Sequence, residues 1–127
     1  MRRLLVVAAL LAACSSNDAN APHPGRLDVI LHGAGAASIG AVVFVVSGGS
    51  IDAVTSAPGD ELGSITDATG THVVLTGAIV DGAIATIAVP DVSRAAAYVV
   101  TIEQVANGAT FGLVDPAPLS MTVVPRQ

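Results

Sequence analysis

The 127-residue chain contains no lysine and no tryptophan, and it has one cysteine and three aromatic residues. The chain has five arginines and ten acidic residues, so its net charge is −5. This charge excludes the basic surface that nucleic-acid binding requires. A single cysteine excludes both an internal disulfide framework and a cysteine-rich zinc site. The scarcity of aromatic residues argues against a platform on which bases or sugar rings stack.

The residues that are present indicate one folded domain. Hydrophobic residues make up 52% of the chain and charged residues 12%, a composition too apolar and too weakly charged for intrinsic disorder. The length allows a single domain of ordinary size, because cores form in units of roughly 100–150 residues.

The N-terminus has the pattern of a secretory signal. Met1, Arg2 and Arg3 form a short basic segment, and residues 4–13 are all Leu, Val or Ala. Ten apolar residues are too few for a transmembrane helix, which needs roughly 20. A basic segment, a short apolar run and small residues before a break together predict a signal peptide over residues 1–13.

The break falls at Leu11-Ala12-Ala13-Cys14, which resembles the lipobox of bacterial lipoproteins. This resemblance implies that the signal is removed before Cys14 and that Cys14 is the lipid-attachment site, acylated on its sulfur and on its new N-terminus. Two or more acyl chains give stable anchoring. The alternatives are an ordinary secretory signal with a chance cysteine, or a buried apolar helix. In the enterobacterial sorting pattern, Asp directly after the lipidated cysteine favours the inner membrane. Because this position is Ser15, the resemblance implies an outer-membrane protein that faces the periplasm or the cell surface.

A tether separates the anchor from the domain. Residues 15–25 read SSNDANAPHPG, with two prolines, several turn formers and no apolar period. We therefore expect a lipidated cysteine with a flexible tether over residues 14–25 and a folded domain over residues 26–127. Without the signal, three arginines remain against all ten acidic residues, so the mature chain has a net charge of −7.

The domain has the pattern of strands and turns. Short apolar or alternating runs bounded by turn residues predict strands over residues 27–32, 41–46, 51–54, 72–76, 83–89, 97–105, 109–113 and 119–123. The run 41–46 is apolar at every position, which predicts a strand buried on both faces. The Gly-Gly turn after it makes 51–54 its expected hairpin partner. The one helix candidate, residues 93–97, is too short to stand alone.

This pattern predicts an all-β fold, an antiparallel β-sandwich of about seven to nine strands, with a closed barrel as the alternative. Residues 35–46, with Phe44 in the strand, and residues 82–91 followed by Tyr98-Val99-Val100-Thr101-Ile102 resemble cohesin-like and Ig-like sandwich domains. The resemblance implies the sandwich fold alone, because no dockerin-recognition motif is matched. Phe44 and Tyr98 fall in core-facing patterns, and we expect the Tyr98 hydroxyl to be hydrogen-bonded near a strand end.

No pattern of catalytic residues is present. The serines lack a Gly-x-Ser-x-Gly elbow, and Gly48-Gly49 lacks the lysine and helix of a phosphate loop. The three histidines, His23, His32 and His72, are far apart in the sequence, and a zinc site would need them to converge with carboxylates such as Asp28 or Asp67. Polar residues at strand edges are the simpler interpretation. We therefore expect no enzyme, no catalytic residues, no metal ligands and no cofactor.

Acidic residues at turns give the remaining candidate site. They could supply oxygen ligands to calcium, but the spacing of a calcium-binding loop is absent and turn chemistry explains their positions equally well. These residues are Asp60, Glu61, Asp67, Asp81 and Asp91. The sequence favours a lipid-anchored envelope protein that serves as a protein-interaction or structural module, with edge strands as a route to a protein partner. The alternative is a calcium-dependent, small-ligand or glycan-binding module.

Overall fold

The structure is a computed structural model that describes residues 21–35 and 38–126. Within these ranges the chain forms nine strands and one short 3-10 helix. They are β1 (Gly25–His32), β2 (Ile39–Ser47), β3 (Ala53–Ser56), β4 (Glu61–Asp67), β5 (Gly70–Ile79), β6 (Gly82–Val89), η2 (Val92–Ala97), β7 (Val99–Asn107), β8 (Leu113–Val114) and β9 (Ser120–Pro125). Cys14, with the predicted signal and most of the predicted tether, lies outside the described residues.

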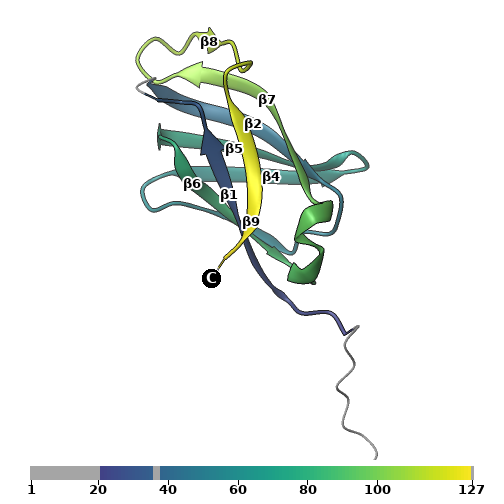
Figure 1. Cartoon of the computed structure of the whole chain (residues 1–127). Helices are drawn as coiled ribbons and strands as arrows, with labels where there is room; N and C mark the ends of the chain where they lie inside the picture. The colour runs from purple at the N-terminus through teal and green to yellow at the C-terminus, as the bar shows by residue number, and fades with distance from the viewer. Residues whose placement is uncertain (1–20, 36–37, 127) are drawn as a thin grey trace, which may run out of the picture.

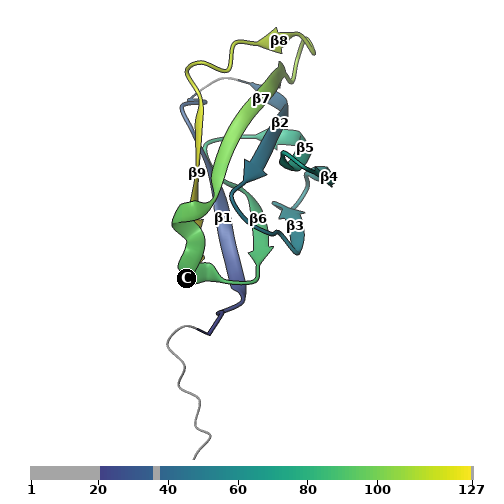
Figure 2. The same ribbon diagram turned by 90° about the vertical axis from the view of Figure 1, so that its right-hand side faces the viewer.

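The strands form two antiparallel sheets that pack face to face (Figures 1 and 2). One sheet has four strands in the order β3-β6-β1-β9, and the other has five in the order β4-β5-β2-β7-β8. The predicted all-β antiparallel sandwich of seven to nine strands is confirmed. The closed-barrel alternative is wrong, because the strands of the described chain divide into two sheets that each end in edge strands.

The core lies between the sheets and is built from alternate residues of each strand. Leu27, Val29 and Leu31 of β1 face Val42, Phe44 and Val46 of β2 across the interface. Phe44 and Tyr98 belong to this core, as the sequence predicts. Burial of a Val, Leu or Phe side chain contributes about 1.5–3 kcal/mol, so this interface is the main source of stability.

The strand β2 differs from its prediction in one respect. Val42, Phe44 and Val46 are buried, but Val43 and Val45 between them are only half-buried. The prediction of burial on both faces is therefore wrong. The reason is that a sheet of a two-layer sandwich is covered by its partner sheet on one face, and in the described part of the chain no second layer covers the other face of this one.

The predicted hairpin between 41–46 and 51–54 is also wrong. Residues 53–56 pair with β6 in the other sheet instead. Gly48 has φ +102°, and a Cβ atom there would collide with the backbone oxygen of Ala97, so the turn needs glycine. Tyr98 holds the turn from the inside by donating its hydroxyl proton to the Ser50 carbonyl at 2.6 Å, the hydrogen bond that the sequence predicts. The chain then crosses to the four-stranded sheet.

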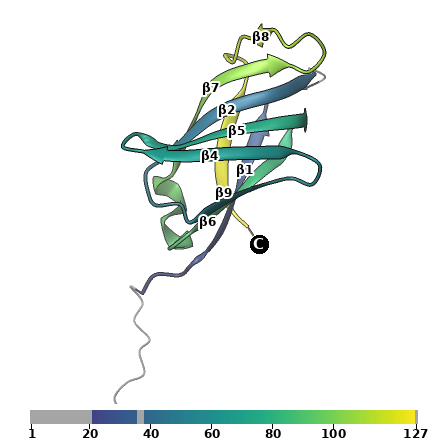
Figure 3. The same ribbon diagram turned by 180° about the vertical axis from the view of Figure 1, so that it is seen from behind.

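The two ends of the sandwich differ. The predicted short helix is confirmed as η2, which lies near the point where the chain enters β1, while β8 lies at the opposite end (Figures 1 and 3). The described residues before β1 contact η2, because the Val92 N–H donates to the His23 carbonyl at 2.8 Å. Among the described residues, no helix has the length and hydrophobicity needed to cross a membrane.

Candidate functional site

The five-stranded sheet turns one face to solvent, here called the outer face, which fronts the view in Figure 3. Residues directly opposite each other on antiparallel strands project to the same side, and the buried residues of β2 and β5 fix which side is the core. The outer face is therefore formed by Glu61, Gly63, Ile65 and Asp67 of β4, His72, Val74 and Thr76 of β5, Ala41, Val43 and Val45 of β2, Val99, Thr101, Gln104 and Ala106 of β7, and Leu113 of β8.

The outer face is unusually apolar for a solvent-facing sheet. Ile65 is 70% exposed, Val99 55% and Val74 46%, and the half-buried side chains of Val43 and Val45 lie between them on β2. Antiparallel sandwiches normally alternate apolar residues inward with polar residues outward. The outward Val43 and Val45 follow directly from the run of apolar residues at 41–46, whereas Ile65, Val74 and Val99 come from β4, β5 and β7.

The solvent-facing side of the four-stranded sheet carries more charged and polar groups. Its inner strand β1 turns Arg26, Asp28, Ile30 and His32 outward, and Val124 of β9 lies opposite Asp28 on the same side. The Thr86 hydroxyl donates to Asp28 Oδ1 at 3.0 Å, and His32 Nε2 lies 3.0 Å from Thr122 Oγ1. Ile30 and Val124 are therefore set among hydrogen-bonded polar side chains, whereas the outer face exposes Ile65, Val74 and Val99.

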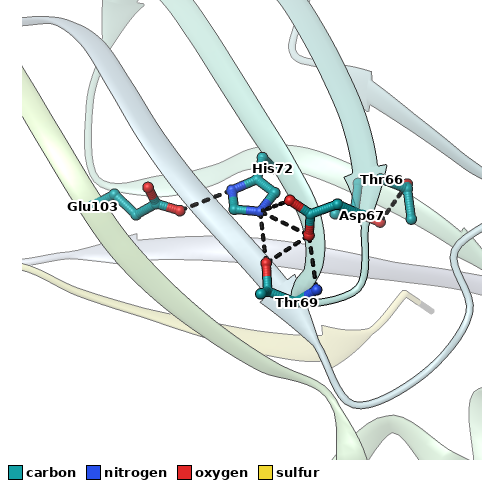
Figure 4. A network of polar contacts seen from close by, with 6 residues as sticks. Thr66, Asp67, Thr69, His72 and Glu103 are labelled. Carbon is teal, nitrogen blue, oxygen red and sulfur yellow. Dashed lines mark hydrogen bonds and ion pairs between the residues drawn. The ribbon is translucent and has the colours of Figure 1, made fainter.

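A polar network crosses the outer face and centres on His72 (Figure 4). The Nε2 atom of His72 lies 3.1 Å from Asp67 Oδ2 and 2.9 Å from Thr69 Oγ1. Its Nδ1 atom lies 3.0 Å from Glu103 Oε1. The network therefore joins the β4–β5 hairpin to β7 by a side-chain bridge that passes over β2. We call Asp67, Thr69, His72 and Glu103 the histidine clasp.

Two local features of the backbone bring these side chains together. A two-residue loop, Ala68-Thr69, joins β4 to β5, and Asp67 closes it by accepting from the Thr69 N–H at 2.7 Å and the Thr69 hydroxyl at 2.6 Å. On β7, the pairing with β2 shifts between Val43 and Phe44, so Glu103 is the extra residue of a β-bulge. Bulges re-aim side chains, and this one places the Glu103 carboxylate within reach of His72.

The electrostatics of the clasp favour its charged form. Hydrogen bonds from the side chain and backbone of Thr69 lower the pKa of Asp67 to about 2 against desolvation, with a smaller contribution from His72. Partial desolvation of the His72 ring lowers its pKa, but the hydrogen bonds and negative charges of Asp67 and Glu103 outweigh this effect and leave the pKa of His72 raised. An imidazolium can donate from both ring nitrogens, which matches the carboxylate on each side.

The chemistry of the clasp differs from that of a catalytic triad. Thr69, His72 and Glu103 lie in the order of nucleophile, base and acid, with hydrogen-bonding distances between them. However, Asp67 occupies the same ring nitrogen as Thr69 and accepts the Thr69 hydroxyl proton. A raised His72 pKa further favours the protonated ring, which cannot act as a base. The arrangement is suited to holding strands together and not to activating the threonine.

The structure separates most of the residues that the sequence singled out. Of the three histidines, only His72 meets carboxylates, and among the described residues no group of three or more His, Cys, Asp or Glu side chains could hold a metal ion. Asp81 accepts from the N–H groups of Ala34 and Gly35, and Asp91 caps η2 by accepting from the Ser93 N–H at 3.0 Å. These aspartates fill the turn roles that the sequence analysis gave as the alternative to calcium binding.

A hollow of about 680 Å³ lies beside η2 and is lined by Gly48, Gly49, Asp91, Arg94 and Tyr98 among others. The polar groups of Asp91 and Tyr98 are already engaged in the cap of η2 and in the turn at Ser50. This hollow therefore presents few groups that could fix the orientation of a small ligand.

Comparison of the chain with protein-family models, with curated proteins and with solved structures gave no match in any of the three. The resemblances to bacterial lipoproteins and to cohesin-like domains stay predictions from the sequence.

The sequence did not predict two features of the site, which are the outer face and the contact of His72 with Glu103. The signal for the outer face was present, because a strand apolar at every position must expose apolar side chains wherever the sheet is covered on one side only.

Proposed function

We propose that the chain is a lipid-anchored, non-enzymatic cell-envelope protein whose domain binds another protein through the outer face. The observation that carries the proposal is the exposure of Ile65, Val74 and Val99 on the same face as the half-buried valines of β2. Apolar patches that a folded domain leaves in contact with water often mark protein-interaction sites.

The side chains of the outer face suit binding for energetic reasons. Full burial of a valine or isoleucine side chain contributes about 1.5–3 kcal/mol, so covering Ile65, Val74 and Val99 would supply a substantial driving force. Their β-branched side chains are already restricted on the strands, so little side-chain entropy is lost when a partner orders them. The histidine clasp adds rigidity, because it ties three strands of the face together.

The charges around the outer face indicate the chemistry of the partner. Glu61, Asp67 and Glu103 project from this face. His72 is the counterion of Asp67 and Glu103. The described arginines lie elsewhere: Arg26 and Arg126 on the four-stranded sheet and Arg94 on η2. A partner with an apolar centre and basic residues at its rim would complement this surface.

The proposed anchor rests on the Leu11-Ala12-Ala13-Cys14 motif of the sequence. The described chain enters the domain beside η2, and the five-stranded sheet extends from there toward β8 (Figure 1). Because His23 is already bonded to Val92, the free tether is residues 15–22, and these eight residues reach at most roughly 26–29 Å when extended. A domain held in this way stands close to the membrane surface with the outer face on its side, where another envelope protein can reach it.

The anchor is tested by replacing Cys14 with Ala and separating the expressed chain between aqueous and detergent phases. We expect the wild type in the detergent phase, with the mass of the acylated chain. We expect the C14A variant to lack the mass of the acyl chains, and either to keep its signal peptide or to leave the detergent phase. Recovery of the same mass and partitioning from both proteins would contradict lipid attachment.

The binding face is tested by chemical crosslinking in native membranes, with Val74→Glu as the variant and Val124→Glu as its control. Val124 is a valine of similar exposure on β9 of the other sheet. We expect V74E to abolish a crosslinked complex that V124E retains. Equal complex formation by both variants would exclude the outer face as the binding surface.

A further inference from the structure

The strand β4 is an edge strand without the usual protection. It runs from Glu61 to Asp67 with the sequence ELGSITD, lies at one end of the five-stranded sheet and is solvent-exposed at six of its seven positions (Figure 3). Natural edge strands are commonly blunted by charged side chains, above all lysine, by proline, by a bulge or by a very short length. The strand β4 has neither proline nor lysine, its charged residues Glu61 and Asp67 lie at its two ends, and its pairing with β5 runs without a register shift.

The other edges of the described sheets are better protected. The strand β3 has four residues, β9 ends in Pro125, and β8 covers part of β7. The strand β4 is therefore the longest unprotected edge in the described part of the chain, and its free backbone groups are the ones that most need a partner.

The direction of those free groups follows from the hairpin. Asp67 and Gly70 flank a two-residue loop, and in such a hairpin the flanking residues form the hydrogen-bonded pair. The next pair, Thr66 and Thr71, is then a non-hydrogen-bonded pair, in which side chains lie closer together, and their hydroxyl oxygens are 3.0 Å apart. By alternation, the backbone N–H and C=O groups of Leu62, Ser64 and Thr66 point away from β5.

We infer that β4 pairs with β4 of a second copy of this chain, antiparallel and about a two-fold axis at Ile65. In this register Ser64 of each copy faces Thr66 of the other, so outward-pointing backbone groups meet and exchange hydrogen bonds in both directions. Ile65, 70% exposed in the single chain, faces Ile65 of the second copy at a non-hydrogen-bonded position, where cross-strand side chains make their closest contact.

Charge selects this register over its neighbour. An axis at Ser64 would set Glu61 directly opposite Asp67 of the second copy, and like charges in directly opposed positions destabilise a sheet. With the axis at Ile65, Asp67 faces Gly63, and the nearest carboxylate of the second copy is Glu61, diagonally two residues along and about 7–8 Å away. The acidic side chains are therefore staggered in this register, whereas an axis at Ser64 sets them directly opposite each other.

The pairing has a consequence for the outer face. Glu61, Gly63, Ile65 and Asp67 lie on the outer side of β4, so joining two copies edge to edge makes the two outer faces continuous. The inference does not depend on the proposed partner protein, because it concerns the strand edge and not the sheet face. Its test also uses no other protein, so the two can fail separately.

Disulfide trapping tests the inference and its register. The full chain carries Cys14→Ser, so that an introduced cysteine is the only thiol, and is kept in detergent. A disulfide requires Cα atoms within about 7 Å. Ile65→Cys places two thiols at the axis and is expected to form a covalent dimer under mild oxidation. Ser64→Cys places the two thiols two positions apart across the strand pair, so this variant is expected to remain monomeric. Val80→Cys, which is exposed in the β5–β6 turn, is expected to remain monomeric as well.

Sedimentation of the same Cys14→Ser chain supplies a second measurement without oxidation. We expect a monomer–dimer equilibrium whose dimer fraction rises with concentration. Ser64→Pro, which removes an outward N–H, and Ile65→Lys should each shift the protein to monomer with unchanged far-UV circular dichroism, whereas Val80→Lys should not. A chain that stays monomeric at all concentrations, or crosslinks equally through Ile65→Cys and Val80→Cys, would overturn the inference. Trapping through Ser64→Cys alone would overturn the register.

Discussion

His72 Nδ1 on β5 and Glu103 Oε1 on β7 lie 3.0 Å apart across the intervening strand β2. The contact depends on the bulge at Glu103, because without the extra residue the carboxylate would not be aimed at the ring. With Asp67 on its other side, His72 holds three strands of the outer face in one register. Its protonation state therefore affects the rigidity of the surface that we propose binds a partner.

Removal of either carboxylate charge should lower the pKa of His72. Asp67 and Glu103 both raise this pKa, through hydrogen bonds and through their charges. We therefore expect Glu103→Gln and Asp67→Asn each to move the pKa of His72 downward, as followed by NMR titration of the ring protons. Titration of all three proteins with the same midpoint would show that the clasp does not form in solution.

The stability that the clasp provides should depend on pH with a defined sign. The folded-state pKa of His72 is raised, so its contribution is fully present below its unfolded pKa of about 6.5 and is lost as the pH rises through the folded value. The pKa of Asp67 is lowered to about 2, so its contribution is present above about 3.8 and is lost as the pH falls toward 2.

Thermal unfolding of wild type and Glu103→Gln between pH 3 and pH 9 checks this window. The difference in melting temperature should be largest between about pH 4 and pH 6.5 and should shrink at pH 9. A difference that is constant, or largest at pH 9, would contradict a protonated His72 in the clasp.

The hydroxyl of Tyr98 should contribute measurably to stability. It donates to the Ser50 carbonyl at 2.6 Å and is largely buried with its ring against the Gly48–Gly49 turn. Tyr98→Phe leaves that carbonyl without its donor, which should cost about 1–2 kcal/mol in the free energy of unfolding measured with urea. A change below 0.3 kcal/mol would mean that water replaces the hydroxyl without cost.

Truncation to alanine should cost much stability at one phenylalanine and almost none at the other. Phe44 is fully buried between the sheets, so Phe44→Ala should cost about 3–5 kcal/mol or abolish folding. Phe111 is 83% exposed in the β7–β8 loop, so Phe111→Ala should stay within about 0.5 kcal/mol of wild type. Similar losses for both variants, measured by urea unfolding, would contradict the placement of the core.

Phe111 also carries backbone strain. Its φ of +61° lies in the left-handed region, which is unfavourable for residues other than glycine by about 1–2 kcal/mol. After allowance for the greater freedom of glycine in the unfolded chain, Phe111→Gly should raise the free energy of unfolding by up to about 1 kcal/mol relative to Phe111→Ala. A loss of stability in that comparison would contradict the loop conformation.

The sequence predicted the strands well where local patterns suffice. The alternation of β1 and the termination of β6 by Pro90 depend only on neighbouring residues, and both strands lie where they were predicted. The pairing of residues 51–54 was predicted wrongly because a Gly-Gly turn fits both a hairpin and a crossing to the other sheet. The contact that decides it, between Tyr98 and Ser50, joins residues 48 positions apart.

The candidate site was predictable only in part. The sequence analysis named Asp67 as a carboxylate that could meet a histidine, and the two-residue loop between β4 and β5 brings it to His72. Glu103 could not be foreseen, because its place depends on the order β5-β2-β7 and on a bulge that no local signal marks. The outer face required knowledge of which side of the sheet the second sheet covers.

Site-specific photo-crosslinking tests the proposed binding face most directly. A photoreactive residue is placed at Val74 on the outer face or at Val124 on the other sheet, and cells expressing the full chain are irradiated. We predict a discrete adduct with a second protein from position 74 and none from position 124, with the adduct lost when Ile65→Asp is added. Adducts of equal yield from both positions, or only a product of twice the mass of the chain from position 74, would contradict a partner protein on the outer face.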